Sequence, residues 1–397
     1  MLWAASIGLC VAYLLLPIAA LVIAGKSGPR GRRFATGGWL SGMFLGVTLL
    51  AVYAIGLGGR VPPFQAVLTI YCGVGLVLFL RSIDAGLSYL LRRGLLRRSR
   101  GGGGVWIAGL ARVALLAAFA LPWVMAAAMV YRPKIVTDAP VLLPHVAVER
   151  VSMLAADGTR ISGWFYRGTT ATRTTALLCH GLGGDPQGFS RLIDRLLQEE
   201  ISVLAIDLRA HGESGGQFCT FGWREKQDVT GAVTWLKQNY AASAEKIVGV
   251  GASLGAAAVL GAAVGDERLD GVVVLSTYST LDEEADYVSR HQLVPPIGWL
   301  VRHFGLAVAS LHAGVNLHAV RPIDDIARLW PRPVLVVHGT DDEIIPFEQG
   351  RRLYEAAPVG RVSMWVQHGT HNGILEDAAV VDRVVNFILS AEPLPIV

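Results

Sequence analysis

The chain has 397 residues, of which 52% are hydrophobic and 17% charged, and its formal net charge is +4. This length allows two or three domains, and the apolar content is too high for an ordinary soluble enzyme. The charge is divided, since residues 1–135 hold 14 basic residues and one acid, while the remainder is acidic overall. The basic residues lie between long apolar runs, which indicates a membrane protein and excludes a nucleic-acid-binding domain.

Four apolar runs near the N-terminus are long enough to cross a bilayer, which takes about 20 residues. The expected spans are residues 2–24 and about 38–57, 64–80 and 113–131. A buried core helix is the alternative for any single run, but four in succession favour an all-α membrane region of about four helices over residues 1–135. A cleaved signal peptide is the alternative for the first run, although no basic segment precedes it.

The positive charges of the loops predict the orientation of these spans. Most lie in the first and third loops, and such residues favour the cytoplasmic side. Both termini are then outside, so the C-terminal domain is expected to be extracytoplasmic on a multi-pass integral membrane protein. Arg132 and Lys134, directly after the last span, argue weakly for the opposite orientation. The lipid bilayer is the expected partner of this region.

A proline-containing linker, residues 136–145, leads to a domain over residues 146–397. Strands are expected at 146–154, 160–166, 175–179, 201–206, 246–250, 271–276, 333–337 and 362–366, and helices at about 188–200, 224–239, 256–263 and 375–389. This alternation predicts an α/β fold with a doubly wound, mostly parallel sheet. An apolar insertion at about 278–329 is expected to be a lid, with extra packing on the sheet as the alternative.

The stretch Lys246–Gly255 carries the strongest chemical signal. An apolar strand leads into Gly251-Ala252-Ser253-Leu254-Gly255, and a small-residue helix follows. Strand, G-x-S-x-G and helix form the context of a nucleophile elbow, in which the serine sits on a strained turn and projects from the sheet. The two glycines avoid collisions with the neighbouring strand and helix. A glycine-rich turn of an ordinary α/β sheet is the alternative for Ser253.

A serine nucleophile needs a histidine base and a carboxylate that orients the base. In the order Ser, acid, His, both partners should follow late strands. Three adjacent acids follow the strand at 333–337, and the residues alone do not choose among them: Asp341, Asp342 and Glu343. Two histidines follow the strand at 362–366, and His371 is favoured because it lies in the loop proper, whereas His368 is nearer the strand.

The oxyanion of the tetrahedral intermediate needs backbone N–H donors. One is expected from Leu254, which follows the nucleophile at a helix N-terminus. The second is expected from Leu182 in the glycine-rich loop His180–Gly184. His180 precedes the serine in the chain, so we expect it to hold this loop rather than to act as the base.

Five motifs in this order resemble the α/β-hydrolase superfamily, over about residues 146–390. They are HGLGG (180–184), DLRAHGES (207–214), GASLG (251–255), HGTDDEIIP (338–346) and GTHN (369–372). The segment before and through HGTDDEIIP is most similar to the branch that holds the serine-aminopeptidase-like hydrolases. The resemblance implies that Asp342 is the acid and His371 the base. Ala210 stands where the family usually has glycine, a small departure.

The resulting expectation is a membrane-anchored serine hydrolase that cleaves an ester, thioester or amide with Ser253, His371 and Asp342. Acyl or lipid-like small molecules are the favoured substrates, and a peptidase is the alternative within the enzyme class. No metal or organic cofactor is implied, and the oligomeric state stays open. A non-catalytic membrane scaffold and a conducting or flipping unit are the alternatives from other classes.

Overall fold

The computed structural model describes residues 146–168 and 172–390, together with positions 74, 77, 125–127, 129–131 and 134–136. The chain divides into two units. The first comprises residues 1–126 with 299–308, and the second comprises residues 127–298 with 309–397. Most of the described residues belong to the second unit.

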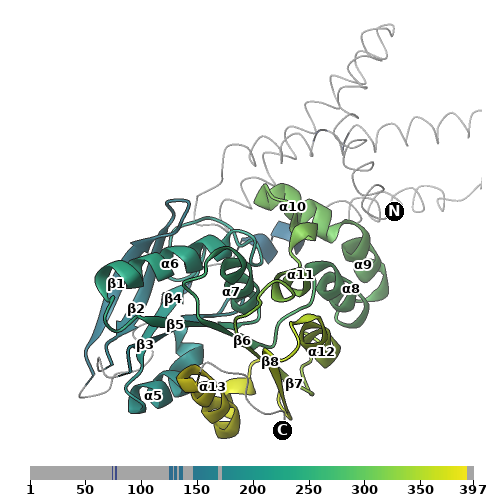
Figure 1. Ribbon diagram of the computed structural model, residues 1–397. Coiled ribbons are helices and arrows are strands. Elements are labelled where there is room, and N and C mark those ends of the chain that lie inside the picture. Colours follow the sequence, from purple (N-terminus) through teal and green to yellow (C-terminus); the bar gives the residue numbers. More distant parts are fainter. Residues whose placement is uncertain are drawn as a thin grey trace, which may run out of the picture. The chain divides into compact units, whose positions relative to one another are not determined.

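The second unit is built on one eight-stranded sheet with the order β1-β2-β4-β3-β5-β6-β7-β8 (Figure 1). Its strands are β1 (Val148–Leu154), β2 (Arg160–Tyr166), β3 (Thr174–Cys179), β4 (Ser202–Asp207), β5 (Lys246–Ala252), β6 (Gly271–Leu275), β7 (Val334–Gly339) and β8 (Val362–Gln367). β2 runs antiparallel to both β1 and β4, and the remaining neighbours in this order pair in parallel. The predicted mostly parallel α/β sheet is confirmed.

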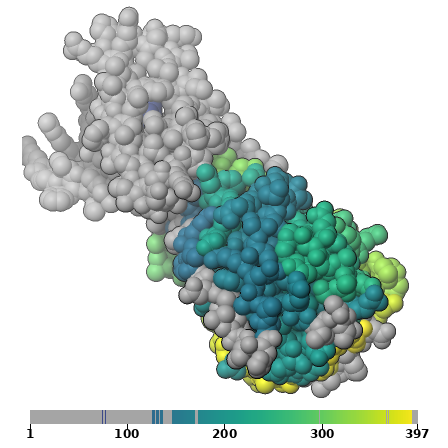
Figure 2. Space-filling model, turned by 90° about the vertical axis from the view of Figure 1, so that its left-hand side faces the viewer, coloured from purple at the N-terminus to yellow at the C-terminus, as the bar shows by residue number. Residues whose placement is uncertain are grey.

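The first two strands form the hairpin expected around Asp157 and Gly158. Gly158 has a φ of 82°, which a residue with a side chain rarely adopts, so glycine suits this turn. Figure 2 views this edge of the sheet, where the atoms of β1 and β2 (blue) lie beside those of helix α6, Glu225–Asn239. The hairpin therefore extends the parallel part of the sheet by two antiparallel strands.

Helices cover both faces of the sheet (Figure 1). On one face α5 (Ser190–Gln198) packs against α13 (Ala378–Ser390), and on the other α6 packs against α7 (Leu254–Gly265). Apolar side chains form the core between the sheet and the first pair. Its helix side chains include Leu192, Ile193 and Leu196 of α5 and Val384, Phe387 and Ile388 of α13. Burying these side chains contributes about 25 cal/mol per Å² of apolar surface.

Two helices begin later than the sequence pattern predicts, because 3₁₀ turns precede them. Pro186–Phe189 forms such a turn before α5, and the Asp185 carboxylate caps it by accepting a hydrogen bond from the Gln187 N–H. Ile374–Glu376 forms another before α13, and the Asp377 carboxylate accepts a hydrogen bond from the Ala379 N–H. Side-chain caps of this kind determine where a helix begins.

The predicted insertion lies between β6 and β7 and is helical. It contains α8 (Leu281–His291), α9 (Pro295–Leu300), α10 (Leu306–Ala313) and α11 (Pro322–Ile326), with a π-helical turn at Val301–Gly305 between α9 and α10. Its role as a lid stays a prediction.

A short segment before β1 contacts the loop that follows β4. The Val130 carbonyl accepts a hydrogen bond from the Cys219 N–H at 2.8 Å. The Tyr131 ring is buried and lies edge-on to Phe218 and His312, with ring centroids 6.1 and 6.0 Å away. The segment that enters the second unit is therefore fixed on this loop.

The predicted membrane spans lie almost entirely outside the described residues. Runs 2–24 and 38–57 have no described position, and runs 64–80 and 113–131 have only eight between them. Within the part of the chain that the structure does describe, no helix is both long and apolar enough to cross a membrane.

Candidate active site

Ser253 occupies a strained turn between β5 and α7. Its φ of 52° and ψ of −118° lie in a region that residues with side chains rarely adopt. Hydrogen bonds from the end of β6 hold the turn: the Ser253 N–H donates to the Leu275 carbonyl at 2.8 Å, and the Thr277 hydroxyl donates to the Ser253 carbonyl at 2.7 Å. This is the backbone geometry expected of a nucleophile elbow.

The two glycines of the motif are required by close contacts. A Cβ on Gly251 would lie 2.4 Å from the Ala256 N atom, at the start of α7. A Cβ on Gly255 would lie 2.1 Å from the Cys179 carbonyl oxygen, at the end of β3. Both distances are far below van der Waals contact, and both obstacles are backbone atoms that cannot move aside. The expected collisions with helix and strand are therefore present.

The structure pairs one of the three candidate acids with one of the two candidate histidines. The Asp342 Oδ2 atom lies 2.9 Å from the His371 Nδ1 atom. The Asp342 side chain is fully buried and that of His371 is 9% exposed. The neighbouring Asp341 lies 3.5 Å from His368 instead, and these two side chains are 59% and 89% exposed. The structure thus pairs Asp342, one of three acids among which the residues alone did not choose, with His371, the histidine that the sequence favoured.

Backbone donors fix the Asp342 carboxylate. Its Oδ1 atom accepts hydrogen bonds from the N–H groups of Ile344 and Ile345, at 3.0 and 2.8 Å. The buried His338 ring, at the end of β7, donates from Nε2 to the Ile345 carbonyl at 2.9 Å and so supports the same turn. Burial lowers the pKa of His338, which favours the neutral ring. Since Asp342 engages Nδ1 of His371, Nε2 is the nitrogen of that ring left to accept a proton.

Ser253, Asp342 and His371 lie on loops at one edge of the sheet. β5, β7 and β8 run parallel, with β6 between β5 and β7, and each residue follows the carboxyl end of one of these strands. Between Ser253 and His371, both of which the structure describes, there is no hydrogen bond. In enzymes without bound substrate such bonds are often long and shorten when substrate binds.

The loop with the second expected oxyanion donor passes next to the serine. A Cβ on Gly181 would lie 3.2 Å from the Ser253 Cβ atom and 3.8 Å from its hydroxyl oxygen. Leu254 is the first residue of α7, so its N–H has no partner within the helix. Among the described residues, the N–H groups of Leu182 and Leu254 both lack a hydrogen-bond partner. One amide in the loop next to Ser253 and one at the start of α7 are therefore free to donate.

His180 holds the glycine-rich loop, as expected. Its Nε2 atom accepts a hydrogen bond from the Leu208 N–H at 3.1 Å, and its Nδ1 atom lies 2.7 Å from the Gly181 carbonyl oxygen. Burial lowers the pKa of its imidazole to about 3. The ring is therefore neutral at physiological pH, and both of its nitrogens are engaged.

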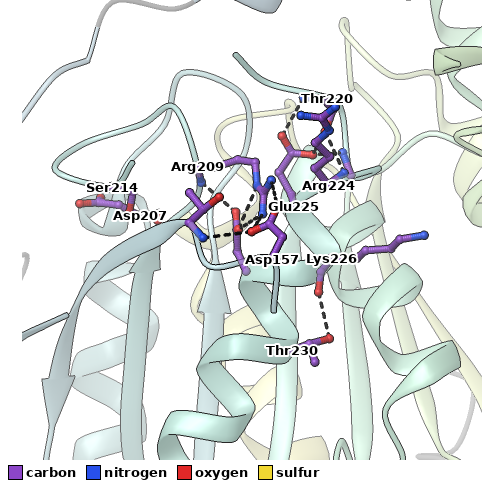
Figure 3. A network of polar contacts seen from close by, with 12 residues as sticks. Asp157, Asp207, Arg209, Ser214, Thr220, Arg224, Glu225, Lys226 and Thr230 are labelled. Atoms are coloured by element: carbon purple, nitrogen blue, oxygen red, sulfur yellow. Dashed lines mark hydrogen bonds and ion pairs between the residues drawn. The ribbon is translucent and has the colours of Figure 1, made fainter. Parts of the chain in front are cut away.

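A buried ion-pair network anchors the loop after β4, and the sequence analysis missed it (Figure 3). The Arg209 guanidinium donates to both Asp228 and Asp157, with shortest distances of 2.6 and 2.8 Å. Nearby, the Glu225 carboxylate accepts hydrogen bonds from the Thr220 hydroxyl and the N–H groups of Thr220 and Gly222. The only sequence signal was Arg209 itself, a charged residue two positions after the end of an apolar strand.

Comparison with known proteins agrees with this fold. The sequence model of the alpha/beta hydrolase family matches residues 176–384, which is more than half of the chain. The chain therefore belongs to the alpha/beta hydrolase family.

Individual relatives are distant. The uncharacterized protein YfhR of Escherichia coli is 27% identical over 253 residues, which cover 62% of this chain and 82% of that protein. Alpha/beta hydrolase domain-containing protein 17C of Mus musculus is 28% identical over 248 residues, covering 61% and 68%. The solved structure of an esterase from Pyrococcus furiosus matches with a TM-score of 0.53 and 23% identity, covering 66% and 97%. At this identity the structural likeness shows the fold alone.

Proposed function

We propose that this protein is a serine hydrolase that cleaves an ester, thioester or amide bond through Ser253, His371 and Asp342. The observation that carries the proposal is the hydrogen bond of 2.9 Å between the buried Asp342 carboxylate and Nδ1 of His371, at the sheet edge that also holds the strained Ser253 turn. Asp342 holds the imidazole in one tautomer and stabilises its protonated form.

The chemistry then follows in two steps. His371 Nε2 takes the Ser253 hydroxyl proton as the oxygen attacks the substrate carbonyl carbon, and the carbonyl oxygen becomes an oxyanion that accepts hydrogen bonds from the Leu254 and Leu182 N–H groups. The leaving group departs with the proton from His371, and the acyl group stays on Ser253. In the second step, a water molecule gives a proton to His371 and attacks the acyl carbon. The bond to Ser253 then breaks, and the Ser253 oxygen takes the proton back from His371.

Acyl or lipid-like esters are the substrates we propose. The apolar character of the insertion and the predicted bilayer support this class, and an archaeal esterase of the same fold makes esters the first compounds to test. The experiment compares an acyl-ester chain-length series with short peptides, using the full chain in detergent. Turnover of acyl esters that Ser253→Ala abolishes is expected. Much faster turnover of peptides would favour the peptidase, and no turnover of either class would favour a scaffold.

We propose further that residues 1–135 anchor the hydrolase in a membrane, with the hydrolase unit extracytoplasmic. The four apolar runs and the charges of their loops support this. A cysteine introduced at Val359, whose side chain is 92% exposed, should react with a membrane-impermeant maleimide on intact cells. Cys179 and Cys219 are buried, and the chain without the introduced cysteine, which also contains Cys10 and Cys72, measures the background. Labelling only after permeabilisation would reverse the orientation, and release of the chain by alkaline carbonate would exclude the anchor.

A further inference from the structure

The loop His180–Gly184 has little backbone support of its own. Its one internal hydrogen bond runs from the Gly184 N–H to the Gly181 carbonyl at 3.1 Å. Two histidine side chains provide the remaining support. His180 contacts the Gly181 carbonyl, and the His211 Nε2 atom accepts a hydrogen bond from the Gly183 N–H at 3.0 Å.

The hydrogen bonds determine the tautomer of each ring. His180 Nε2 accepts from the Leu208 N–H, so the proton is on Nδ1, which donates to the Gly181 carbonyl. His211 Nε2 accepts from the Gly183 N–H, so its Nδ1 carries the proton and donates to the Arg209 carbonyl at 2.9 Å. Both histidines are 3% exposed, and their ring centroids lie 4.8 Å apart. Each ring thus presents one donor and one acceptor to the backbone.

These contacts leave one free amide among the three that follow Gly181. The loop has three successive amides after Gly181: that of Gly183 is taken by His211, and that of Gly184 by the Gly181 carbonyl. The Gly181 carbonyl and the Leu182 N–H belong to one planar trans peptide and point in opposite directions. Because His180 holds this carbonyl, the Leu182 N–H must point away from the His180 ring. Of these three amides, only that of Leu182 keeps a donor for a substrate oxygen.

The second histidine is itself held in place. His211 lies on the loop whose Arg209 is bound to Asp228 and Asp157, with an Arg209 side chain only 4% exposed (Figure 3). The Arg209 N–H also donates to Asp228, at 2.9 Å. The buried network therefore anchors the backbone from which His211 reaches the glycine-rich loop.

We propose that His180 and His211 are a pair of positioning residues that select the Leu182 amide as the oxyanion donor. The inference rests on the proposed serine-hydrolase function and deepens it. Neither ring touches substrate, and neither is an acid or base in the reaction. Their effect is to keep one amide of the loop unpaired and directed, so that it needs no reorganisation when the oxyanion forms.

The test compares His211→Leu, which removes the acceptor for Gly183, with His211→Gln, whose side-chain oxygen can replace it. Loss of one oxyanion donor costs about 10²- to 10³-fold in kcat. We expect a loss of that order for His211→Leu with KM nearly unchanged, and recovery of most of it in His211→Gln. A trifluoromethyl ketone, which forms a tetrahedral adduct with the serine, should lose affinity by a similar factor in the leucine variant only.

The outcomes separate this inference from the proposed function. Wild-type protein that hydrolyses neither acyl esters nor peptides would overturn the function itself. An active wild type whose His211→Leu variant keeps its kcat and ketone affinity would overturn only the positioning role, as would a loss confined to KM or one that glutamine does not restore. If His211→Leu does not fold, His211→Asn replaces it, because an asparagine side chain is too short to reach Gly183. We expect the same loss of kcat and of ketone affinity for His211→Asn.

Discussion

Asp342 and His371 lie 29 positions apart in the sequence, and their side chains meet at 2.9 Å between Oδ2 and Nδ1. The carboxylate accepts two further backbone hydrogen bonds and is fully buried. A carboxylate held in this way keeps its partner imidazole in one orientation and one tautomer. The relationship makes Asp342, rather than either neighbouring acid, the residue on which activity should depend.

Asp342→Asn should keep the shape of the site but lower kcat by about 10⁴-fold, because an amide stabilises the wrong tautomer of the base. Asp341→Asn is the matched control, since that side chain is 59% exposed and faces His368. Steady-state kinetics on an acyl ester measure both. Equal losses in the two variants, or a larger loss in Asp341→Asn, would mean that the acid is assigned to the wrong residue.

The assignment of His371 as the base predicts a similar contrast between two neighbouring histidines. His371→Ala should abolish turnover, because no other group takes the Ser253 proton, whereas His368→Ala should leave kcat nearly unchanged because that side chain is 89% exposed. Activity that survives in His371→Ala but not in His368→Ala would move the base to the other histidine.

Alanine at Gly255 should destabilise the fold, because its Cβ would lie 2.1 Å from the Cys179 carbonyl oxygen. The control is Gly265→Ala at the end of α7, where a Cβ meets nothing within 4 Å. That substitution should stabilise the protein by about 0.4–1 kcal/mol, since alanine loses less backbone freedom on folding. Thermal unfolding measures the difference. A Gly255→Ala variant as stable as the wild type would show that the elbow packs less closely than described.

The buried network predicts an effect on stability. Removing one partner of a buried ion pair leaves the other charge unpaired, so Arg209→Ala should cost roughly 3–5 kcal/mol. Arg351→Ala breaks two exposed ion pairs on α12 (Phe347–Ala356) and should have little effect. Urea unfolding of both variants is the comparison, and similar unfolding midpoints would contradict the anchoring role of Arg209.

The same network predicts a dependence on pH. Partial burial opposes the shift, but hydrogen bonds from Arg209 and Thr159 lower the pKa of Asp157 from 3.8 to about 2. A lowered carboxyl pKa contributes stability above the unfolded value, and that contribution is lost as pH falls through the folded value. The difference in unfolding midpoint between wild type and Asp157→Asn should therefore be constant above about pH 4 and shrink toward pH 2. A difference that does not change with pH would exclude this linkage.

Local patterns predicted much of the fold. The hairpin at Asp157-Gly158, the alternating strands and the elbow at Ser253 follow from periodicity and turn chemistry within a few residues. The choice among three adjacent acids could not be made in this way. Asp342 is distinguished by amides of its own turn and by a histidine 29 residues away, and both contacts require the folded chain.

The contacts that hold the loops of the site in place also could not be predicted from the sequence. Arg209 and Asp157 are separated by 52 residues, and His211 and Gly183 by 28. No spacing rule links such pairs, since their distance depends on the order of strands in the sheet. His211 belongs to the motif DLRAHGES (207–214), but its hydrogen bond to the glycine-rich loop depends on how the fold places the two loops.

Reaction of the full chain with a fluorophosphonate, followed by mass spectrometry of the peptide that contains Ser253, tests the central claim most directly. A serine activated by His371 should form a covalent phosphonyl adduct at Ser253 in the wild type, and Ser253→Ala should stay unlabelled. A folded wild type that forms no adduct, or an adduct that forms equally in Ser253→Ala, would contradict the account.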